Sequence, residues 1–149
     1  MAGRYHNYRV HVSWSGDTGA AYSRAHVIDA PGKPAIAGSS DPSFRGDAAR
    51  WNPEELLLAA LSACHKLWYL DLCARAGIRV LAYQDKAEGV MVEEPGGAGA
   101  FASATLRPVI TLAPGSDKAA AAALHEKAHK MCFIARSVNF PVFIAPFMN

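Results

Sequence analysis

The chain has 149 residues, of which 51% are hydrophobic and 19% charged, and its formal net charge at pH 7 is +2. A chain of this length buries roughly 68–70% of its unfolded surface. We therefore expect a single domain over residues 1–149 that needs no disulfide or metal to fold. The scattered charges exclude the basic patch of a nucleic-acid-binding protein. An odd count of three cysteines argues against a secreted disulfide scaffold and fits a reducing cytosol.

The N-terminus and the apolar segments bear on the cellular location of the protein. Residues 1–10 contain arginine and histidine and lack the apolar stretch of a secretory signal, so we expect a cytoplasmic protein. The longest uncharged apolar run, residues 56–64, is soon followed by Lys66 and Asp71 and falls short of the roughly 18 apolar residues that span a bilayer. We therefore expect neither a membrane nor a nucleic acid as a partner.

The N-terminal segment has the pattern of a β-hairpin. Residues 8–14 alternate between apolar and polar side chains, which predicts a strand with one buried face. A turn at residues 16–19 and a second strand at residues 21–28 complete the predicted hairpin. Residues 31–50 are expected to form a long loop, and long loops in small domains often carry binding or active-site residues.

A long helix is predicted over residues 52–76, with Gly77 as its stop. Asn52 is a good N-cap, Pro53 suits the first helical position, and two acidic residues follow in the first turn. Residues 56–64 are apolar on all sides, so we expect the helix to be enclosed on most sides. A helix about 36 Å long is difficult for one small chain to enclose, and a second subunit would solve this.

The C-terminal half predicts a hairpin, a second helix and a last strand. Two strands are expected at residues 78–92 and 101–112, joined by a glycine-rich connection. The second helix is predicted over residues 117–135, and residues 142–147 are expected to add the final strand.

The three cysteines occupy different positions in these elements. Cys64 lies in the middle of the first predicted helix, and Cys132 lies near the end of the second. Cys73 is half a turn around the first helix from Cys64 and about 13 Å along it, so these two thiols cannot pair while the helix holds. We interpret Cys73 as a small core residue, which is the usual role of a free cysteine.

The surroundings of the other two cysteines carry a family pattern. The segment NPEELLLAALSAC ending at Cys64, with a second cysteine late in the chain at Cys132, resembles the OsmC/Ohr family of thiol-dependent organic hydroperoxide reductases. The resemblance implies an α+β OsmC-like fold, with antiparallel β-sheets wrapped around long central helices, and an intertwined homodimer with active sites at its interface. It further implies a peroxidase of the stress response that detoxifies organic hydroperoxides, uses an external dithiol reductant and needs no cofactor or metal.

By family position, Cys64 is the peroxidatic cysteine and Cys132 the resolving one. A thiolate attacks the peroxide bond, and the resulting sulfenic acid condenses with a second thiol to form a redox-active disulfide. An apolar helix raises the pKa of a cysteine, so the site needs a positive charge to hold the thiolate.

The resemblance implies that an arginine held by a glutamate supplies this charge. Glu54 occupies the glutamate position, and Arg45 is the best match for the arginine, with Arg50 and Arg24 left open. Glu54 also suits the helix start through the helix dipole. The ten residues from Glu54 to Cys64 span about 15 Å of helix, too far for contact within one chain. Our hypothesis is that the Arg–Glu pair comes at least partly from the partner subunit.

Four aromatic residues near these positions are candidates for binding the organic part of a hydroperoxide: Trp68, Phe44, Trp51 and Phe133. Core packing is the alternative role for each. The family typically has proline directly after the resolving cysteine, and this chain departs from that pattern at Phe133.

Two other interpretations stay open. His125, His129 and Cys132 follow one face of the second helix, and Cys64 would complete a zinc site with two histidines and two cysteines. Alternatively, the same scaffold serves a noncatalytic binding or stress protein. His65 is not a candidate base for Cys64, because adjacent helix positions project about 100° apart.

Overall fold

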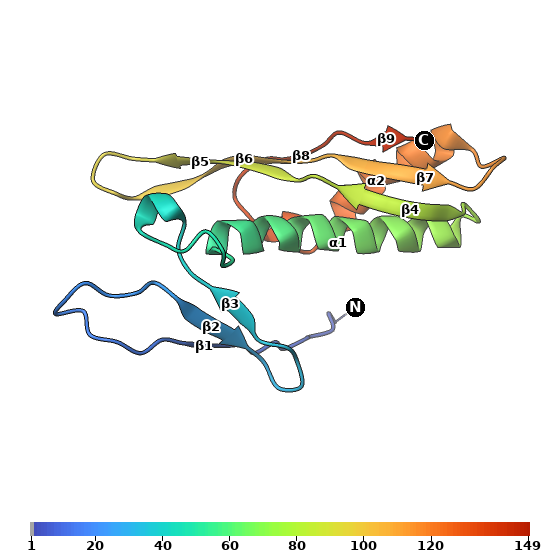
Figure 1. The fold of residues 1–149 in the computed structure, drawn as a ribbon. Helices are drawn as coiled ribbons and strands as arrows, with labels where there is room; N and C mark the ends of the chain where they lie inside the picture. The colour runs from blue at the N-terminus through green and yellow to red at the C-terminus, as the bar shows by residue number, and fades with distance from the viewer. Residues whose placement is uncertain (1) are drawn as a thin grey trace. The chain divides into compact units, whose positions relative to one another are not determined.

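A computed structural model describes residues 2–149 of the chain (Figure 1). Contacts between Cα atoms divide the chain into two compact units, one ending at Leu56 and the other running Leu57–Asn149. The division falls within the first turns of a long helix, α1 (Pro53–Arg75). The single domain over residues 1–149 stays a prediction.

The N-terminal unit contains one antiparallel sheet in the order β1-β2-β3, followed by a short 3₁₀ helix. In chain order the elements are β1 (His11–Ser13), β2 (His26–Asp29), β3 (Ile36–Gly38) and η1 (Pro42–Phe44). The predicted hairpin is confirmed, but β3 and η1 lie in the segment predicted as loop. The predicted burial of one strand face is wrong for a single chain, because Val10 and Val12 are 73% and 59% exposed.

Helix α1 begins and ends where its sequence predicts. A reciprocal capping box joins Asn52 and Glu55 at its start: the Glu55 N–H donates to Asn52 Oδ1 (2.8 Å), and the Asn52 N–H donates to Glu55 Oε1 (3.3 Å). At its end Gly77 adopts φ +73°, which favours glycine, and the Ile78 N–H returns to the Cys73 carbonyl at 2.9 Å.

One face of α1 is buried, and the rest is not. The buried residues are Leu61, His65, Tyr69, Leu72 and Cys73. A single chain therefore meets the expectation of an enclosed helix only in part: the C-terminal unit covers one face of α1, the flanks are partly buried, and a stripe that includes Leu67 is exposed.

Helix α1 also has the length and composition to cross a membrane, unlike any other helix of the described residues. An 18-residue window of this helix has a mean hydropathy of 1.3 and is 28% buried. The charged residues Lys66 and Asp71 therefore lower the hydropathy of the helix less than expected from the sequence. Core helices of soluble proteins share this property, and it is weak evidence for a membrane span.

The C-terminal unit has two three-stranded sheets, in the orders β4-β7-β9 and β5-β6-β8, and a second helix, α2. Its elements after α1 are β4 (Val80–Asp85), β5 (Glu88–Glu93), β6 (Gly99–Leu106), β7 (Pro108–Leu112), α2 (Lys118–Met131), η2 (Ala135–Ser137), β8 (Val142–Ile144) and β9 (Phe147–Met148). The expectation of antiparallel sheets is confirmed for the pairs β4–β7 and β5–β6, but β8 and β9 run parallel to β6 and β7.

Each of the two long strands predicted in this unit is divided between the two sheets. The Arg107 N–H donates to the Asp85 carboxylate at 2.7 Å, and Pro108 has no N–H to donate. The chain therefore leaves one sheet at Arg107 and enters the other at Pro108. Side chains of α1, β7 and α2 share one core, and Figure 1 shows α1 running beneath β4 and β7.

Helix α2 is shorter than predicted. Asp117 caps its start by accepting from the Ala120 N–H at 3.0 Å, and the helix ends at Met131. Cys132 is the C-cap residue with extended backbone (φ −67°, ψ 113°), so it stands in the turn between α2 and η2 rather than inside a helix.

Candidate active site

The structure brings together Cys64, on α1, and Cys132, in the turn that follows α2. Cys64 lies midway along α1 and is half-buried, whereas Cys132 directly follows α2 and is 1% exposed. Both are free thiols, and the Cys64 side chain is close enough to affect the ionisation of Cys132. The two thiols are therefore neighbours, which a reversible disulfide between them requires.

The surroundings of Cys132 hold it in the protonated form. Burial, and to a smaller extent the neighbouring Cys64, raises the pKa of Cys132 to about 11, against the opposing effect of backbone N–H groups. One of these, from Ala135, donates to Cys132 Sγ at 3.4 Å. Because the thiolate is the reactive form, Cys132 is unsuited to attack first and Cys64 is the more accessible sulfur.

Cys73 is part of the hydrophobic core, as predicted. It is 1% exposed and packs in the cluster that contains Tyr69 and Ile110. Burial raises its pKa. Cys73 thus has the properties of an inert core thiol.

Two of the four candidate aromatic residues meet beside the thiols. Trp68, one turn after Cys64, contacts Phe133 edge to face with ring centroids 5.5 Å apart. Phe133 is 67% exposed, so this pair presents apolar surface next to Cys132. The other two, Phe44 and Trp51, belong to the N-terminal unit, where they are 38% and 51% exposed.

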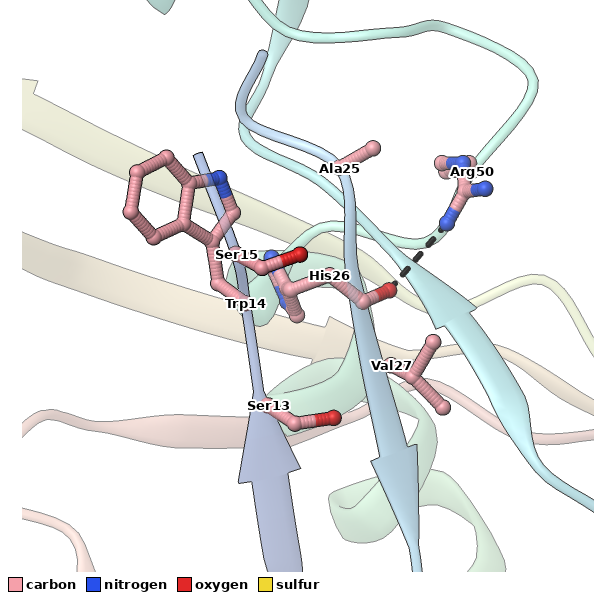
Figure 2. A pocket seen from close by; sticks show the side chains of 7 residues that line it. All are labelled: Ser13, Trp14, Ser15, Ala25, His26, Val27 and Arg50. Carbon is pink, nitrogen blue, oxygen red and sulfur yellow. Dashed lines mark hydrogen bonds between the residues drawn. The ribbon is translucent and has the colours of Figure 1, made fainter. Parts of the chain in front are cut away.

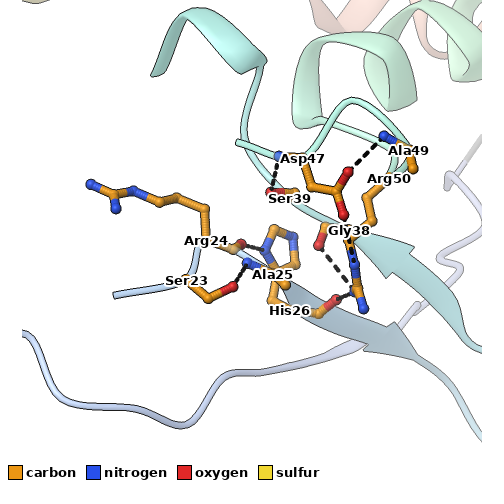
Figure 3. A network of polar contacts seen from close by, with 9 residues as sticks. All are labelled: Ser23, Arg24, Ala25, His26, Gly38, Ser39, Asp47, Ala49 and Arg50. Atoms are coloured by element: carbon orange, nitrogen blue, oxygen red, sulfur yellow. Dashed lines mark hydrogen bonds and ion pairs between the residues drawn. The ribbon is translucent and has the colours of Figure 1, made fainter. Parts of the chain in front are cut away.

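The three candidate arginines differ in their contacts. Arg50 Nη1 donates to the carbonyls of His26 (3.1 Å) and Gly38 (3.4 Å), and its Nε faces the Asp47 carboxylate at 3.9 Å (Figure 3). Arg24 lies over the Tyr22 ring, 4.0 Å from its centroid, and donates to the Tyr22 carbonyl. Both guanidinium groups are therefore engaged within the N-terminal unit.

Arg45 is the exception. Its side chain is exposed and makes no hydrogen bond or ion pair within the described residues. Its backbone is left-handed (φ +65°), which no other described residue except glycine adopts. This conformation costs a residue with a side chain about 1–2 kcal/mol. Strained residues with an unengaged side chain are frequent at functional sites.

Arg50 also lines a pocket of about 290 Å³ in the N-terminal unit (Figure 2). Trp14 and His26 line the same pocket. The His26 Nδ1–H donates to the Arg24 carbonyl at 2.9 Å, so the imidazole is fixed by the backbone. Because Arg50 is committed to two carbonyls and a carboxylate, we assign it a structural role in holding β2, β3 and the following loop.

The two adjacent glutamates have separate roles. Glu55 closes the capping box with Asn52, whereas Glu54 is half-buried and makes no hydrogen bond or ion pair with the described residues. Glu54 is therefore available for a partner outside its own chain.

The four residues of the zinc alternative do not converge. No group of three or more His, Cys, Asp or Glu side chains within residues 2–149 is arranged to hold a metal ion. His125 Nδ1 instead lies 2.9 Å from His65 Nε2, in a direct hydrogen bond.

Sequence reasoning missed this histidine pair. His65 and His125 are 1% and 3% exposed, and burial lowers their pKa values to about 4 and about 3. Both are therefore neutral at pH 7. The sequence feature that could have indicated the burial of His65 is its spacing: it lies four residues after Leu61 and four before Tyr69, on the buried face of α1.

The sequence and the fold match known proteins. A family model described as OsmC-like protein matches residues 46–146. An OsmC-like protein of unknown function from Vibrio cholerae is 29% identical, with a TM-score of 0.87 over 96% of this chain and 100% of that chain. No curated protein matches this chain.

Two solved structures carry a functional description. An organic hydroperoxide resistance protein from Elizabethkingia anophelis is 21% identical, with a TM-score of 0.72 over 97% of this chain and 99% of that one. Another from Legionella pneumophila is 18% identical, with a TM-score of 0.70 over 95% and 97%. At these identities the likeness shows the fold alone, which confirms the α+β fold of this type.

Proposed function

Because this chain belongs to the family of OsmC-like proteins, we propose that it is a cysteine-based peroxidase that reduces organic hydroperoxides to alcohols and water. The observation that carries the proposal is the proximity of Cys64, on α1, and Cys132, in the turn after α2. Related folds described as organic hydroperoxide resistance proteins support the same chemistry.

The reaction proceeds in three steps. The Cys64 thiolate attacks the hydroperoxide, so an S–O bond forms, the O–O bond breaks and the alkoxide takes a proton to leave as alcohol. Cys132 then attacks the sulfenic sulfur of Cys64. The disulfide forms, and the hydroxyl leaves as water with the proton of Cys132. An external dithiol returns two electrons by thiol–disulfide exchange.

Arg45 and Glu54 complete the site in this proposal. A thiolate in an apolar helix needs a nearby positive charge, and Arg45 is the candidate whose guanidinium is unengaged. Glu54 makes no hydrogen bond or ion pair with residues 2–149 and would hold that arginine in place. We propose that at least part of this pair comes from the partner subunit, because about 15 Å of helix separates Glu54 from Cys64.

The proposed partner is a second copy of this chain. Apolar surface is exposed on both units: Leu67 on α1 is 64% exposed, and Val10 before β1 is 73% exposed. Covering such surface is the common reason for a soluble protein to form a homodimer. In light scattering at micromolar concentration we expect a dimer. Leu67→Glu should give a monomer, whereas the control Lys127→Glu on the exposed face of α2 should not.

The remaining parts of the proposal concern substrate and cell. Trp68 and Phe133 would contact the organic part of the hydroperoxide, with Phe44 and Trp51 as further candidates. Free thiols fit a cytoplasmic protein, where reducing systems recycle disulfides. A role in peroxide detoxification during stress follows from this chemistry.

A turnover assay tests the proposal. The purified protein is mixed with cumene hydroperoxide and excess dithiothreitol, and hydroperoxide consumption is followed against Cys64→Ser as the control. We expect multiple turnovers with the natural chain and none above background with the variant. Equal consumption by both proteins would contradict the peroxidase, and the noncatalytic binding protein would then be the better interpretation.

A further inference from the structure

We propose that His65 and His125 are positioning residues of the cysteine pair: their hydrogen bond fixes the register of α1 against α2, so that Cys64 and Cys132 meet. The inference rests on the proposed dithiol chemistry and adds to it a determinant outside the reacting atoms.

The two imidazoles form a well-oriented hydrogen bond between α1 and α2. His65 Nε2 and His125 Nδ1 are 2.9 Å apart, and the two rings are nearly parallel, with an interplanar angle of 7°. The Tyr69 ring stacks on His125 with centroids 3.8 Å apart, and Tyr69 Oη donates to the Ala121 carbonyl at 3.0 Å. Packing therefore holds both imidazoles in one orientation.

The pair lies between the thiols and the rest of the helix interface. Contacts pair Cys64 with Cys132, His65 with His125 and Tyr69 with Ala121. As residue numbers rise on α1, they fall on α2, so the two helices run antiparallel along this interface. His65 directly follows Cys64, which makes its hydrogen bond the nearest side-chain link between the helices to the reacting sulfurs.

Apart from Leu124, which packs against the same core, the remaining buried side chains of α2 are small and apolar. Residues 119–123 are all alanine, and the buried positions Ala121 and Ala128 present only methyl groups. Apolar contact between small side chains is non-directional and tolerates sliding. A buried hydrogen bond is directional and costs free energy if left unmade, so it specifies one register.

The hydrogen bond is stable over the physiological pH range. One proton lies in the bridge, so in the neutral pair one outer nitrogen carries a hydrogen and the other does not. These outer atoms, His65 Nδ1 and His125 Nε2, are buried and have no hydrogen-bond partner among the described residues. The titratable groups around the pair are Tyr69 on α1, His129 on α2, and Tyr83 and Asp85 on β4. Burial outweighs the attraction of Asp85 and keeps the pKa values of both imidazoles low, so neither carries a charge above pH 5.

Closing the disulfide is the step that depends on this register. Diamide, a thiol oxidant, drives the same closure without a hydroperoxide: it takes two electrons and the two thiol protons to become a hydrazine, and the S–S bond forms. A misplacement of about 1 Å can slow such a step roughly a hundredfold.

The experiment compares three variants in the full chain. His125→Leu removes the hydrogen bond at similar volume, and His125→Asn keeps a polar atom at the position of Nδ1. Tyr69→Phe removes the hydrogen bond from Tyr69 to the Ala121 carbonyl, which lies about 6 Å farther from the thiols along α1. We expect His125→Leu to slow closure at least about tenfold, while Cys64 oxidation by hydroperoxide keeps its rate. His125→Asn and Tyr69→Phe should stay within about threefold of the natural chain. Equal closure in the natural chain and His125→Leu would overturn the proposal, and so would equal slowing of both steps.

If His125→Leu does not fold, a measurement on the natural chain tests the proposal instead. Nitrogen-15 NMR should detect coupling between His65 Nε2 and His125 Nδ1 across the hydrogen bond from pH 5 to 8, and its absence would overturn the proposal. A chain that closes with diamide but ignores hydroperoxide contradicts the proposed function, and the variants then still decide the positioning role.

Discussion

Asn52 and Glu55 hold each other at the first turn of α1, with hydrogen bonds of 2.8 and 3.3 Å in the two directions. Glu55 is thereby committed to the helix start, and Glu54 beside it is not. Asn52→Ala removes the cap and should lower the free energy of unfolding by about 1 kcal/mol. Urea unfolding measures the effect, and an unchanged midpoint would show that the capping box contributes nothing.

Glu54→Gln should affect activity rather than stability. Because Glu54 has no partner among the described residues, we expect a free energy of unfolding within about 0.5 kcal/mol of the natural chain. If it orients the arginine at the thiolate, kcat/KM for hydroperoxide should fall by about tenfold or more. Glu55→Gln is the matched control, and an equal loss of activity in both variants would argue against the assignment.

Substitution of Arg45 should affect activity, whereas substitution of Arg50 should affect stability. Arg45→Gln removes an exposed, unengaged guanidinium and should slow the oxidation of Cys64 about a hundredfold, with little effect on unfolding. Arg50→Gln removes hydrogen bonds to the His26 and Gly38 carbonyls, so it should lower stability by about 1–3 kcal/mol. Stopped-flow oxidation and urea unfolding provide the two readouts. A stable Arg50→Gln variant with no activity would make Arg50 the catalytic arginine.

The two cysteines should fail at different steps. Cys64→Ser should abolish hydroperoxide consumption, because no other thiol of the chain is both accessible and placed to react. Cys132→Ser should consume about one equivalent of hydroperoxide and stop as a sulfenic acid, since the closing thiol is gone. Dimedone trapping followed by mass spectrometry detects that sulfenic acid. Full turnover by Cys132→Ser with dithiothreitol would show that the reductant can attack Cys64 directly and that Cys132 is dispensable.

Acid should destabilise the protein through the buried histidine pair. In the unfolded chain an imidazole has a pKa near 6.5, whereas burial lowers the pKa of His65 to about 4 and that of His125 to about 3. Because the folded state favours the neutral forms, their full contribution is present above pH 6.5 and is lost as the pH falls through 6.5 toward 3. At pH 5 the loss is roughly 2 kcal/mol for each imidazole. Urea unfolding at pH 7 and pH 5 measures it, and His125→Asn should lose about half as much.

The helix starts, the cysteine motif and the order of the elements were predictable from the sequence because they depend on local chemistry. Asn52-Pro53 sets the start of α1, Gly77 its end, and Asp117 the start of α2. The family pattern around Cys64 and Cys132 predicted a meeting that only the packing of α1 on α2 produces.

The sequence-based predictions were wrong for features that depend on tertiary contacts. The sequence pattern of residues 78–92 and 101–112 is continuous, and the division between sheets comes from the contact of Arg107 with Asp85 and from Pro108. The partly exposed surface of α1 has the same origin, since an apolar pattern predicts burial without stating what buries it. The sequence also could not distinguish the three candidate arginines, because the difference lies in which guanidinium groups donate hydrogen bonds to backbone carbonyls in the folded chain.

Thiol mapping after a single turnover tests whether Cys64 and Cys132 reduce a hydroperoxide together. The reduced protein is treated with one equivalent of cumene hydroperoxide per chain, digested without reductant and analysed by mass spectrometry. We expect loss of the hydroperoxide and an equal amount of disulfide between Cys64 and Cys132, with Cys73 still a thiol. Three unreacted thiols and an unchanged hydroperoxide concentration would contradict this expectation.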